Sequence, residues 1–170
     1  MTDTNTTMMS GDKSAALDMH TILAILIAGS TGTIAFDLFG QAISPGLGFA
    51  NLAPVGLARS LLGALGLPNG NPAGNLLHLF LVGLIAYPVG WLFIAKPIIA
   101  KIIPGLHWVI ASAIYGVGLW VFAIGGVTKV AGLPFFLNFT GITWVALTGH
   151  TLYAIVCAAT FVYLNSLRAK

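Results

Sequence analysis

The sequence predicts an all-α membrane protein: a bundle of four transmembrane helices, with a short interfacial helix between the first and second spans. Three observations support this fold class. Hydrophobic residues make up 58% of the 170 residues and charged residues only 6%, whereas a soluble domain carries about 25% charged residues. Asp37 is the only acidic residue after residue 18. Four stretches reach the roughly 20 apolar residues that a helix needs to cross the hydrocarbon core.

The predicted spans cover about residues 21–40, 75–95, 107–127 and 143–164. We interpret the first as a retained helix, because its apolar run exceeds the roughly 7–15 residues of a cleaved signal. Residues 1–18, rich in Thr, Ser and Asp, are expected to form a mobile cytoplasmic tail. Residues 19–170 then form a single four-helix domain.

The longest connection, residues 41–74, is rich in glycine and proline. Its middle, residues 54–65, is apolar but too short to span a membrane. Because this segment starts at Pro54 and carries Arg59 on one face, it predicts the short interfacial helix. The connections 96–106 and 128–142 are short, which favours antiparallel neighbouring helices.

Basic residues predict the orientation, because cytoplasmic segments of membrane proteins are enriched in lysine and arginine. With both termini in the cytoplasm, the inner segments hold Lys13, Lys96, Lys101, Arg168 and Lys170, and the outer segments hold Arg59 and Lys129. Trp91, Trp108 and Trp144 fall near predicted span ends, as expected of an aromatic belt.

Small residues predict where the helices pack against each other, since membrane helices associate through close contacts between such residues. The candidates are Ala28 and Gly32 in the first span and Ser112 and Gly116 in the third. They would serve packing within the bundle or in a homo-oligomer. Pro88 is expected to kink the second span.

One polar cluster could carry chemistry. Asp37 and His78 lie about 5 Å from the outer ends of their predicted spans, and His150 about 10 Å. An ionisable group at this depth is costly unless a partner satisfies it, so we expect Asp37, His78 and His150 to converge inside the bundle. The cluster would then either lock helices together or handle protons, a metal or a cofactor.

Two cofactors remain open at these positions. Imidazole and carboxylate are ordinary ligands of divalent metals, and two membrane histidines, here His78 and His150, could ligate a haem axially. The sequence contains no i, i+3 or i, i+4 ligand pair and no c-type haem attachment motif. No cofactor is therefore firmly implied.

Several function classes lack their motifs. The sequence has no phosphate-binding loop, nucleophile elbow or paired carboxylates, which favours a role other than catalysis. Cys157 is the single cysteine, so a disulfide framework is excluded. The basic residues are scattered and form no stripe for nucleic acid.

A family resemblance appears at the same residues. The run Gly32 to Asp37, His78 with Tyr87-Pro88 and Trp91, Gly116 with Trp120, Pro134-Phe-Phe136, and Gly149-His150 with Tyr153 resemble the YagU-like bacterial inner-membrane proteins. The likeness covers about residues 20–160. It implies a small four-helix protein of the bacterial inner membrane in which this aspartate and these histidines recur, and it implies no established reaction.

These observations favour a non-enzymatic accessory or assembly subunit that docks on a larger bacterial membrane complex, respiratory or photosynthetic. The reason is that almost none of the chain remains outside the membrane to form a catalytic domain. Two alternatives stay open: a small oligomeric transporter or proton-coupled permease that uses Asp37, His78 and His150, and a haem-binding redox subunit. The expected partners are the lipid bilayer and either another membrane protein or further copies of this chain.

Overall fold

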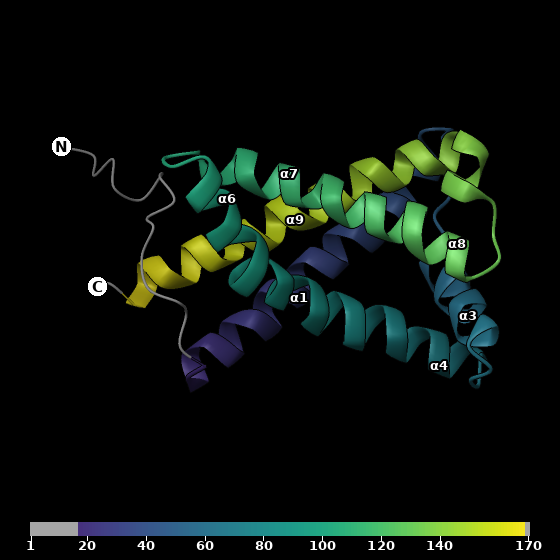
Figure 1. Cartoon of the computed structure of the whole chain (residues 1–170), viewed down its shortest axis with the longest axis horizontal. Coiled ribbons are helices and arrows are strands. Elements are labelled where there is room, and N and C mark those ends of the chain that lie inside the picture. The colour runs from purple at the N-terminus through teal and green to yellow at the C-terminus, as the bar shows by residue number, and fades with distance from the viewer. Residues whose placement is uncertain (1–16, 169–170) are drawn as a thin grey trace.

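The structure is a computed structural model, and it describes residues 17–168. It confirms the predicted fold class: four long apolar helices form a bundle, and the described residues contain no strand (Figure 1). We call these helices spans 1 to 4; they cover Met19–Gly46, Asn71–Ile102, Trp108–Val130 and Gly141–Arg168. The predicted mobile tail falls almost wholly on residues 1–16, which lie outside the described residues.

The first three spans are built from consecutive helical segments. Span 1 consists of α1 (Met19–Leu38), η2 (Phe39–Ile43) and α2 (Ser44–Gly46). Span 2 consists of α4 (Asn71–Asn75), η3 (Leu76–Ala86), α5 (Tyr87–Gly90), η4 (Trp91–Ala95) and α6 (Lys96–Ile102). Span 3 consists of α7 (Trp108–Trp120), η5 (Val121–Val127) and α8 (Thr128–Val130), and span 4 is α9 (Gly141–Arg168).

Two further helices lie in the connections. The helix α3 (Pro54–Ala64) is the short helix predicted between spans 1 and 2, and Pro54 occupies its first turn as expected. The turn η6 (Phe135–Phe139) lies between spans 3 and 4. Both sit at the same end of the bundle.

The η segments inside the spans are wide helical turns, in which a backbone N–H bonds the carbonyl five residues before it. Proline explains most of them, because it has no N–H and its ring clashes with the carbonyl four residues earlier. The N–H donors of Ser44, Tyr87 and Lys96, each directly before a proline, bond Phe39, Val82 and Trp91. In span 3 the Thr128 hydroxyl donates a hydrogen bond to the Ile124 carbonyl. The Thr128 N–H therefore bonds the Ala123 carbonyl instead.

These wide turns make spans 1 and 2 longer than predicted. Span 1 was expected to stop near Gly40 but continues through Pro45. Span 2 was expected to stop before Lys96 but continues through Pro97 to Ile102. A charged residue such as Lys96 limits the apolar stretch that can lie in hydrocarbon, but the helix itself can continue beyond it. A wide turn likewise lets the helix continue past a proline.

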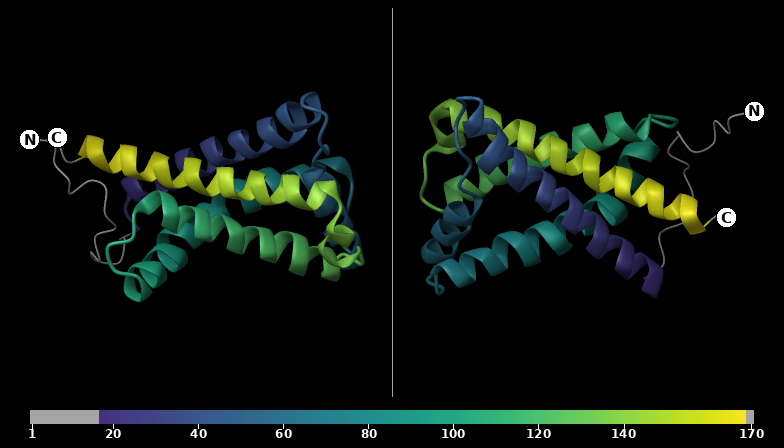
Figure 2. Two further views of the ribbon diagram at one scale, coloured as in Figure 1. Left: turned by 90° about the horizontal axis from the view of Figure 1, so that it is seen from above. Right: turned by 180° about the vertical axis from the view of Figure 1, so that it is seen from behind.

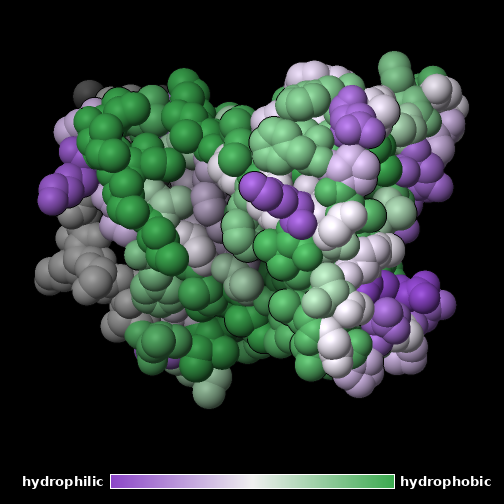
Figure 3. Space-filling model, turned by 45° about the vertical axis from the view of Figure 1, so that its right-hand side comes forward, coloured by the Kyte–Doolittle hydropathy of each residue, from purple (hydrophilic) through white to green (hydrophobic). Residues whose placement is uncertain are grey.

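The bundle has two distinct ends. The first residues of span 1 and the last residues of span 4 lie at one end, which we call the terminal end; α3 and η6 lie at the other, which we call the α3 end (Figures 1 and 2). Spans 1 and 4 cross each other, and span 4 also packs along span 3. Hydrophobic residues dominate the surface in Figure 3, and hydrophilic ones gather mainly toward the α3 end.

Spans 2 and 3 meet near the terminal end and diverge toward the α3 end (Figure 1). Where they meet, the Tyr115 hydroxyl donates a hydrogen bond to the Tyr87 carbonyl at 2.7 Å. Trp91 packs against Tyr115 there, with ring centroids 5.6 Å apart, and is only 3% exposed. Its assignment to an aromatic belt was therefore wrong: span 2 continues past Trp91 to Ile102, so Trp91 lies well within the span.

Candidate functional site

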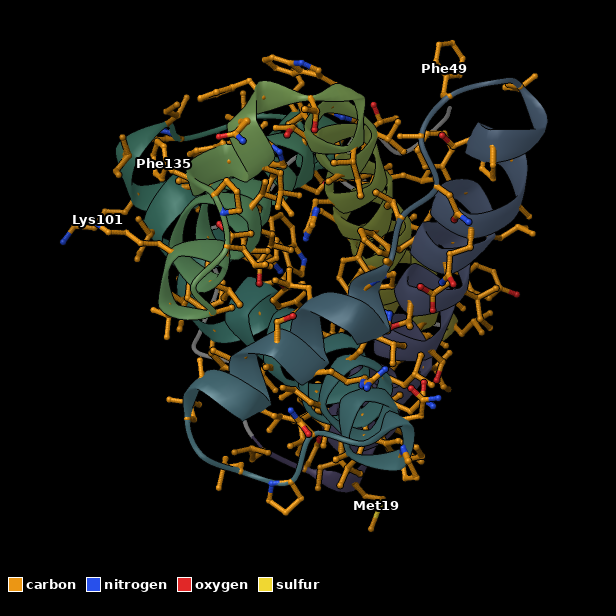
Figure 4. All side chains as sticks on the ribbon, turned by 90° about the vertical axis from the view of Figure 1, so that its right-hand side faces the viewer. Met19, Phe49, Lys101 and Phe135 are labelled. Carbon is orange, nitrogen blue, oxygen red and sulfur yellow. The ribbon has the colours of Figure 1, made fainter. Side chains whose placement is uncertain are left out.

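A cavity of about 430 Å³ lies inside the bundle at the α3 end. All four spans contribute to its walls, and so do α3 and η6. Figure 4, viewed onto this end, shows α3 crossing in front of the bundle. The cavity falls within the roughly 300–1,000 Å³ of ordinary small-molecule sites, and its walls are almost entirely apolar.

The structure brings two of the three predicted cluster residues into direct contact. The His78 Nε2 atom donates to Asp37 Oδ1 at 3.0 Å, so the pair joins span 1 to span 2. Asp37 Oδ1 also accepts from Gln41 Nε2, one helical turn later, at 2.8 Å. His78 lines the cavity and Asp37 does not, so the carboxylate stands behind the imidazole.

The third residue, His150, faces the same cavity but bonds elsewhere. Its Nδ1 atom lies 2.7 Å from the Ala146 carbonyl of its own helix. The contact that connects it to His78 is aromatic: the Phe36 ring lies 5.0 Å from the His150 ring and 6.0 Å from the His78 ring, between centroids. Gly149 makes room for this, because a Cβ there would lie 3.0 Å from Phe36.

All three residues lie farther from the ends of their helices than predicted. Asp37 is nine residues from Gly46, His78 seven from Asn71 and His150 nine from Gly141. These intervals correspond to about 10–14 Å of helical rise from the span ends. The prediction of about 5 Å for Asp37 and His78 was wrong because the helices extend beyond the predicted limits: span 1 ends at Gly46 and span 2 begins at Asn71.

The hydrogen-bond partner of His150 defines its tautomer. A carbonyl oxygen only accepts, so Nδ1 carries a proton. His150 is 5% exposed, and burial in apolar surroundings disfavours a charged ring. The neutral ring therefore has a lone pair on Nε2, and the hydrogen bonds found within residues 17–168 involve only Nδ1 of this ring.

Two tyrosines close the cavity toward the terminal end. The Tyr153 hydroxyl donates to the Gly83 carbonyl at 2.6 Å. The rings of Tyr87 and Tyr153 meet edge to face, 5.5 Å apart between centroids. Below them the core is filled by buried side chains that include Trp91 and Cys157. The cavity therefore ends at this tyrosine layer.

Thr33 adds a polar group beside the tyrosine layer. It is 8% exposed and lines the cavity. Its hydroxyl oxygen is buried and has no hydrogen-bond partner among the described residues. It packs against Gly83, whose missing side chain leaves the space.

The wall formed by η6 has an unusual backbone. Phe136, Leu137, Asn138 and Phe139 have φ angles of 46°, 49°, 56° and 54°, in the left-handed region that costs L residues about 1–2 kcal/mol each. Packing holds the turn in place: the Phe136 and Trp120 rings lie 4.7 Å apart between centroids, and Phe136 fills the space beside Gly125. The Thr143 hydroxyl bonds the Phe136 carbonyl at 2.6 Å, and Leu137 reaches the cavity.

The four predicted packing residues are all buried between helices. Ala28 and Ser112 are 0% exposed. A Cβ at Gly32 would lie 2.9 Å from the Tyr153 ring, and one at Gly116 would lie 2.6 Å from the Thr151 Cα atom. These positions serve packing within the bundle.

The surroundings of His78 and His150 also bear on the metal and haem alternatives. In the part of the chain that the structure describes, no three His, Cys, Asp or Glu side chains lie close enough to hold a metal together. His78 is engaged with Asp37, and Phe36 packs against both imidazole rings.

Sequence reasoning from the polar residues missed the cavity walls. Tyr87, Tyr153 and Phe136 of η6 entered only through the family resemblance, and α3 was not assigned to the site. One signal was available: a proline leaves a carbonyl without its helical donor, so Pro88 required an outside donor, and Tyr153 provides one.

Comparison of the chain with protein-family models, with curated proteins and with solved structures found no match.

Proposed function

We propose that the protein binds a small, uncharged and largely apolar molecule in the cavity beneath α3. The cavity itself is the observation that supports this proposal most directly. Binding sites for small molecules are mostly apolar and contain a few polar groups that fix orientation. Here His78, His150 and Tyr87 would supply those groups.

The Asp37–His78 pair would position the imidazole. A carboxylate bonded to one ring nitrogen fixes the orientation of the ring, and the 3.0 Å contact does this for His78. The occupant would then meet an imidazole held in place from behind, while the carboxylate stays out of the apolar wall.

The runner-up from the sequence, a transporter or permease, has weaker support. A transport path must continue to the other side of the membrane, whereas the cavity ends at Tyr87 and Tyr153. Transport would require a second conformation that opens the layer of Trp91 and Cys157 below. Binding requires no such change.

We further propose the membrane setting predicted from the sequence, including membership of the YagU-like proteins. The terminal end would face the cytoplasm of a bacterium and the α3 end would face outward. Lys96, Lys101 and Arg168 lie at the terminal end, and Arg59 and Lys129 lie at the α3 end, as the enrichment of basic residues in the cytoplasm requires. Reporter fusions after Lys170 and after Asn71 should report the cytoplasm and the outer side, respectively.

The role in the cell that we propose is an accessory or assembly subunit of a larger respiratory or photosynthetic membrane complex. The described chain has little mass outside its four spans, so its contacts would lie within the bilayer. Copurification from native membranes in mild detergent should recover a larger complex. A free, monodisperse protein would contradict this role without affecting the binding proposal.

Retention of a lipophilic molecule tests the binding proposal. We expect mass spectrometry of organic extracts to find one bound to protein purified in mild detergent. The matched variants are Leu57→Trp, which fills the cavity from α3, and Leu62→Trp on the same helix, which does not line the cavity. Leu57→Trp should lose the molecule and Leu62→Trp should keep it. No retained molecule, or equal retention in both variants, would overturn the proposal.

A further inference from the structure

Building on the proposed function, we infer that the occupant is an uncharged lipid with a hydroxyl group, and that it enters from the bilayer through a window between spans 2 and 3. The window, the position of α3 over the end of the cavity, the absence of charge in the walls and the free acceptor on His150 support this inference independently.

The window follows from the divergence of spans 2 and 3. Tyr115 faces span 2 and bonds the Tyr87 carbonyl. Phe122 lies seven residues later, on the same helical face, because seven residues make about two turns. At that level the spans have separated, so Phe122 lines the cavity and is also 61% exposed. An exposed side chain that also lines a cavity lies at its opening.

Phe122 lies at the depth of lipid chains. It is eight residues from Val130, the end of span 3, which is about 12 Å of helical rise. The hydrocarbon core is about 30 Å thick. An opening at this depth meets acyl chains, so molecules dissolved in the bilayer reach it directly.

The α3 helix lies over the cavity at the same end. It contacts α4 at the start of span 2 and α8 at the end of span 3, and so bridges the gap where these spans are farthest apart. Arg59 fixes it: its Nε atom donates to the Asn69 carbonyl at 2.8 Å and its guanidinium donates to Asn71 Oδ1 at 3.0 Å. The lateral route therefore needs no movement of α3.

The walls exclude a charged headgroup. Among the described residues that line the cavity, none is Lys, Arg, Asp or Glu. A phosphate or an ammonium group would lose its hydration there without gaining a counter-charge, which is strongly unfavourable. An uncharged lipid avoids this cost.

The free nitrogen of His150 selects for a hydroxyl. Its Nε2 atom is an acceptor, because Nδ1 is the donor to Ala146. An occupant that only accepts hydrogen bonds, such as an ether, leaves this lone pair without a hydrogen bond. A hydroxyl donates to it. The Tyr87 side chain also lines the cavity, and its hydroxyl can in turn donate to the oxygen of the occupant.

A matched pair of isoprenoids tests the chemistry. Geranylgeraniol and its O-methyl ether share one apolar body and differ in the hydroxyl donor. Their affinities are measured by competition with tritiated geranylgeraniol on protein in phosphatidylcholine nanodiscs, with empty nanodiscs as background. We expect the alcohol to bind about tenfold more tightly, the effect of one hydrogen bond to a buried acceptor.

Two histidine variants assign the donor preference to its site. His150→Phe keeps an aromatic ring without the acceptor and should reduce the alcohol-to-ether ratio to about one. His107→Asn, at the terminal end, should leave the ratio unchanged. Equal binding of alcohol and ether to the unmodified protein would refute the hydroxyl preference and leave the proposed function intact. Binding of neither would refute the proposed function itself.

Rates test the route. Phe122→Trp narrows the window and should slow both association and dissociation of the alcohol at least threefold. The matched control is Phe80→Trp on span 2, where Phe80 is 55% exposed but does not line the cavity; its rates should not change. Unchanged rates in Phe122→Trp, or equal slowing in both variants, would overturn entry between spans 2 and 3.

Discussion

Replacing Tyr153 with phenylalanine should destabilise the bundle, because the Gly83 carbonyl would lose its hydrogen-bond donor. Pro88 has no N–H, and the N–H of Tyr87 bonds Val82, so the Gly83 carbonyl has neither its four-residue nor its five-residue helical donor. The Tyr153 hydroxyl satisfies it at 2.6 Å. Tyr153→Phe keeps the ring that packs on Gly32 and Tyr87 and removes only this donor.

The expected loss is about 1–2 kcal/mol. Side-chain hydrogen bonds between membrane helices contribute about 0.6–2 kcal/mol, and a buried acceptor without a partner costs about 1–3 kcal/mol. The site favours the upper part of the first range. Tyr153 is 2% exposed and Gly83 is buried, so lipid and water cannot readily replace the lost donor.

A double-mutant cycle with Pro88→Ala separates this effect from packing. Alanine at position 88 restores an N–H that can bond the Gly83 or Leu84 carbonyl, so Tyr153→Phe should cost less in that background. The assay is denaturant unfolding of the purified protein in mixed micelles, followed by tryptophan fluorescence. A coupling energy near zero, or a loss below about 0.5 kcal/mol for Tyr153→Phe alone, would refute the compensation of Pro88 by Tyr153.

Three further predictions address packing, pH and cofactors. Gly116→Ala should lower the free energy of unfolding by about 1–3 kcal/mol, because its Cβ would lie 2.6 Å from backbone in span 4, whereas Gly118→Ala, with nothing within 4 Å, should be neutral or slightly stabilising. The backbone hydrogen bond from Thr21, with Arg168 nearby, lowers the pKa of the Asp18 carboxyl below its usual 3.8. Its stabilisation is therefore present above that pH and lost as the pH falls through the lowered pKa, so the wild type should lose stability relative to Asp18→Asn between pH 5 and pH 3, measured by thermal unfolding. The purified protein should show no Soret band in its visible spectrum, because Phe36 packs against both imidazole rings and His78 is engaged by Asp37; a Soret band lost in His150→Phe would instead support the haem alternative.

The four spans were predictable because each is a long apolar run, and the bilayer requires about 20 such residues. The span ends were not predictable in the same way, because a glycine such as Gly40 or a lysine such as Lys96 only disfavours a continuing membrane helix locally. A wide turn before Pro45 or Pro97 satisfies the backbone locally and lets the helix continue. The prediction for Trp91 was wrong for the same reason: the expected span end near residue 95 placed it at the membrane interface, whereas span 2 continues to Ile102 and Trp91 is buried.

The Asp37–His78 contact was also predictable. Asp37 is the only acid after residue 18, and a single acid at membrane depth has few partners available to it. The position of His150 was only partly predictable, since Ala146 of its own helix supplies an acceptor that no sequence pattern singles out. The left-handed turn at Phe136–Phe139 could not be predicted at all, because three of its four residues are bulky and disfavour that conformation.

Two prolines connect the fold to the cavity. Each leaves the carbonyl of a glycine five residues earlier without a helical donor, and each of these carbonyls recruits a residue from elsewhere. The Gly40 carbonyl, before Pro45, accepts from the Leu52 N–H at 2.9 Å. The Gly83 carbonyl, before Pro88, accepts from Tyr153. Leu52 and Tyr153 both line the cavity.

Glycine is suited to both positions because a cavity-lining side chain packs directly against it. A Cβ at Gly40 would overlap the Leu52 side chain, and one at Gly83 would overlap Thr33. The same feature therefore satisfies the backbone and shapes the wall. It follows that Pro45→Ala and Pro88→Ala should alter the cavity as well as the helices, so that either substitution should change the affinity for geranylgeraniol even though neither introduces nor removes a polar side chain.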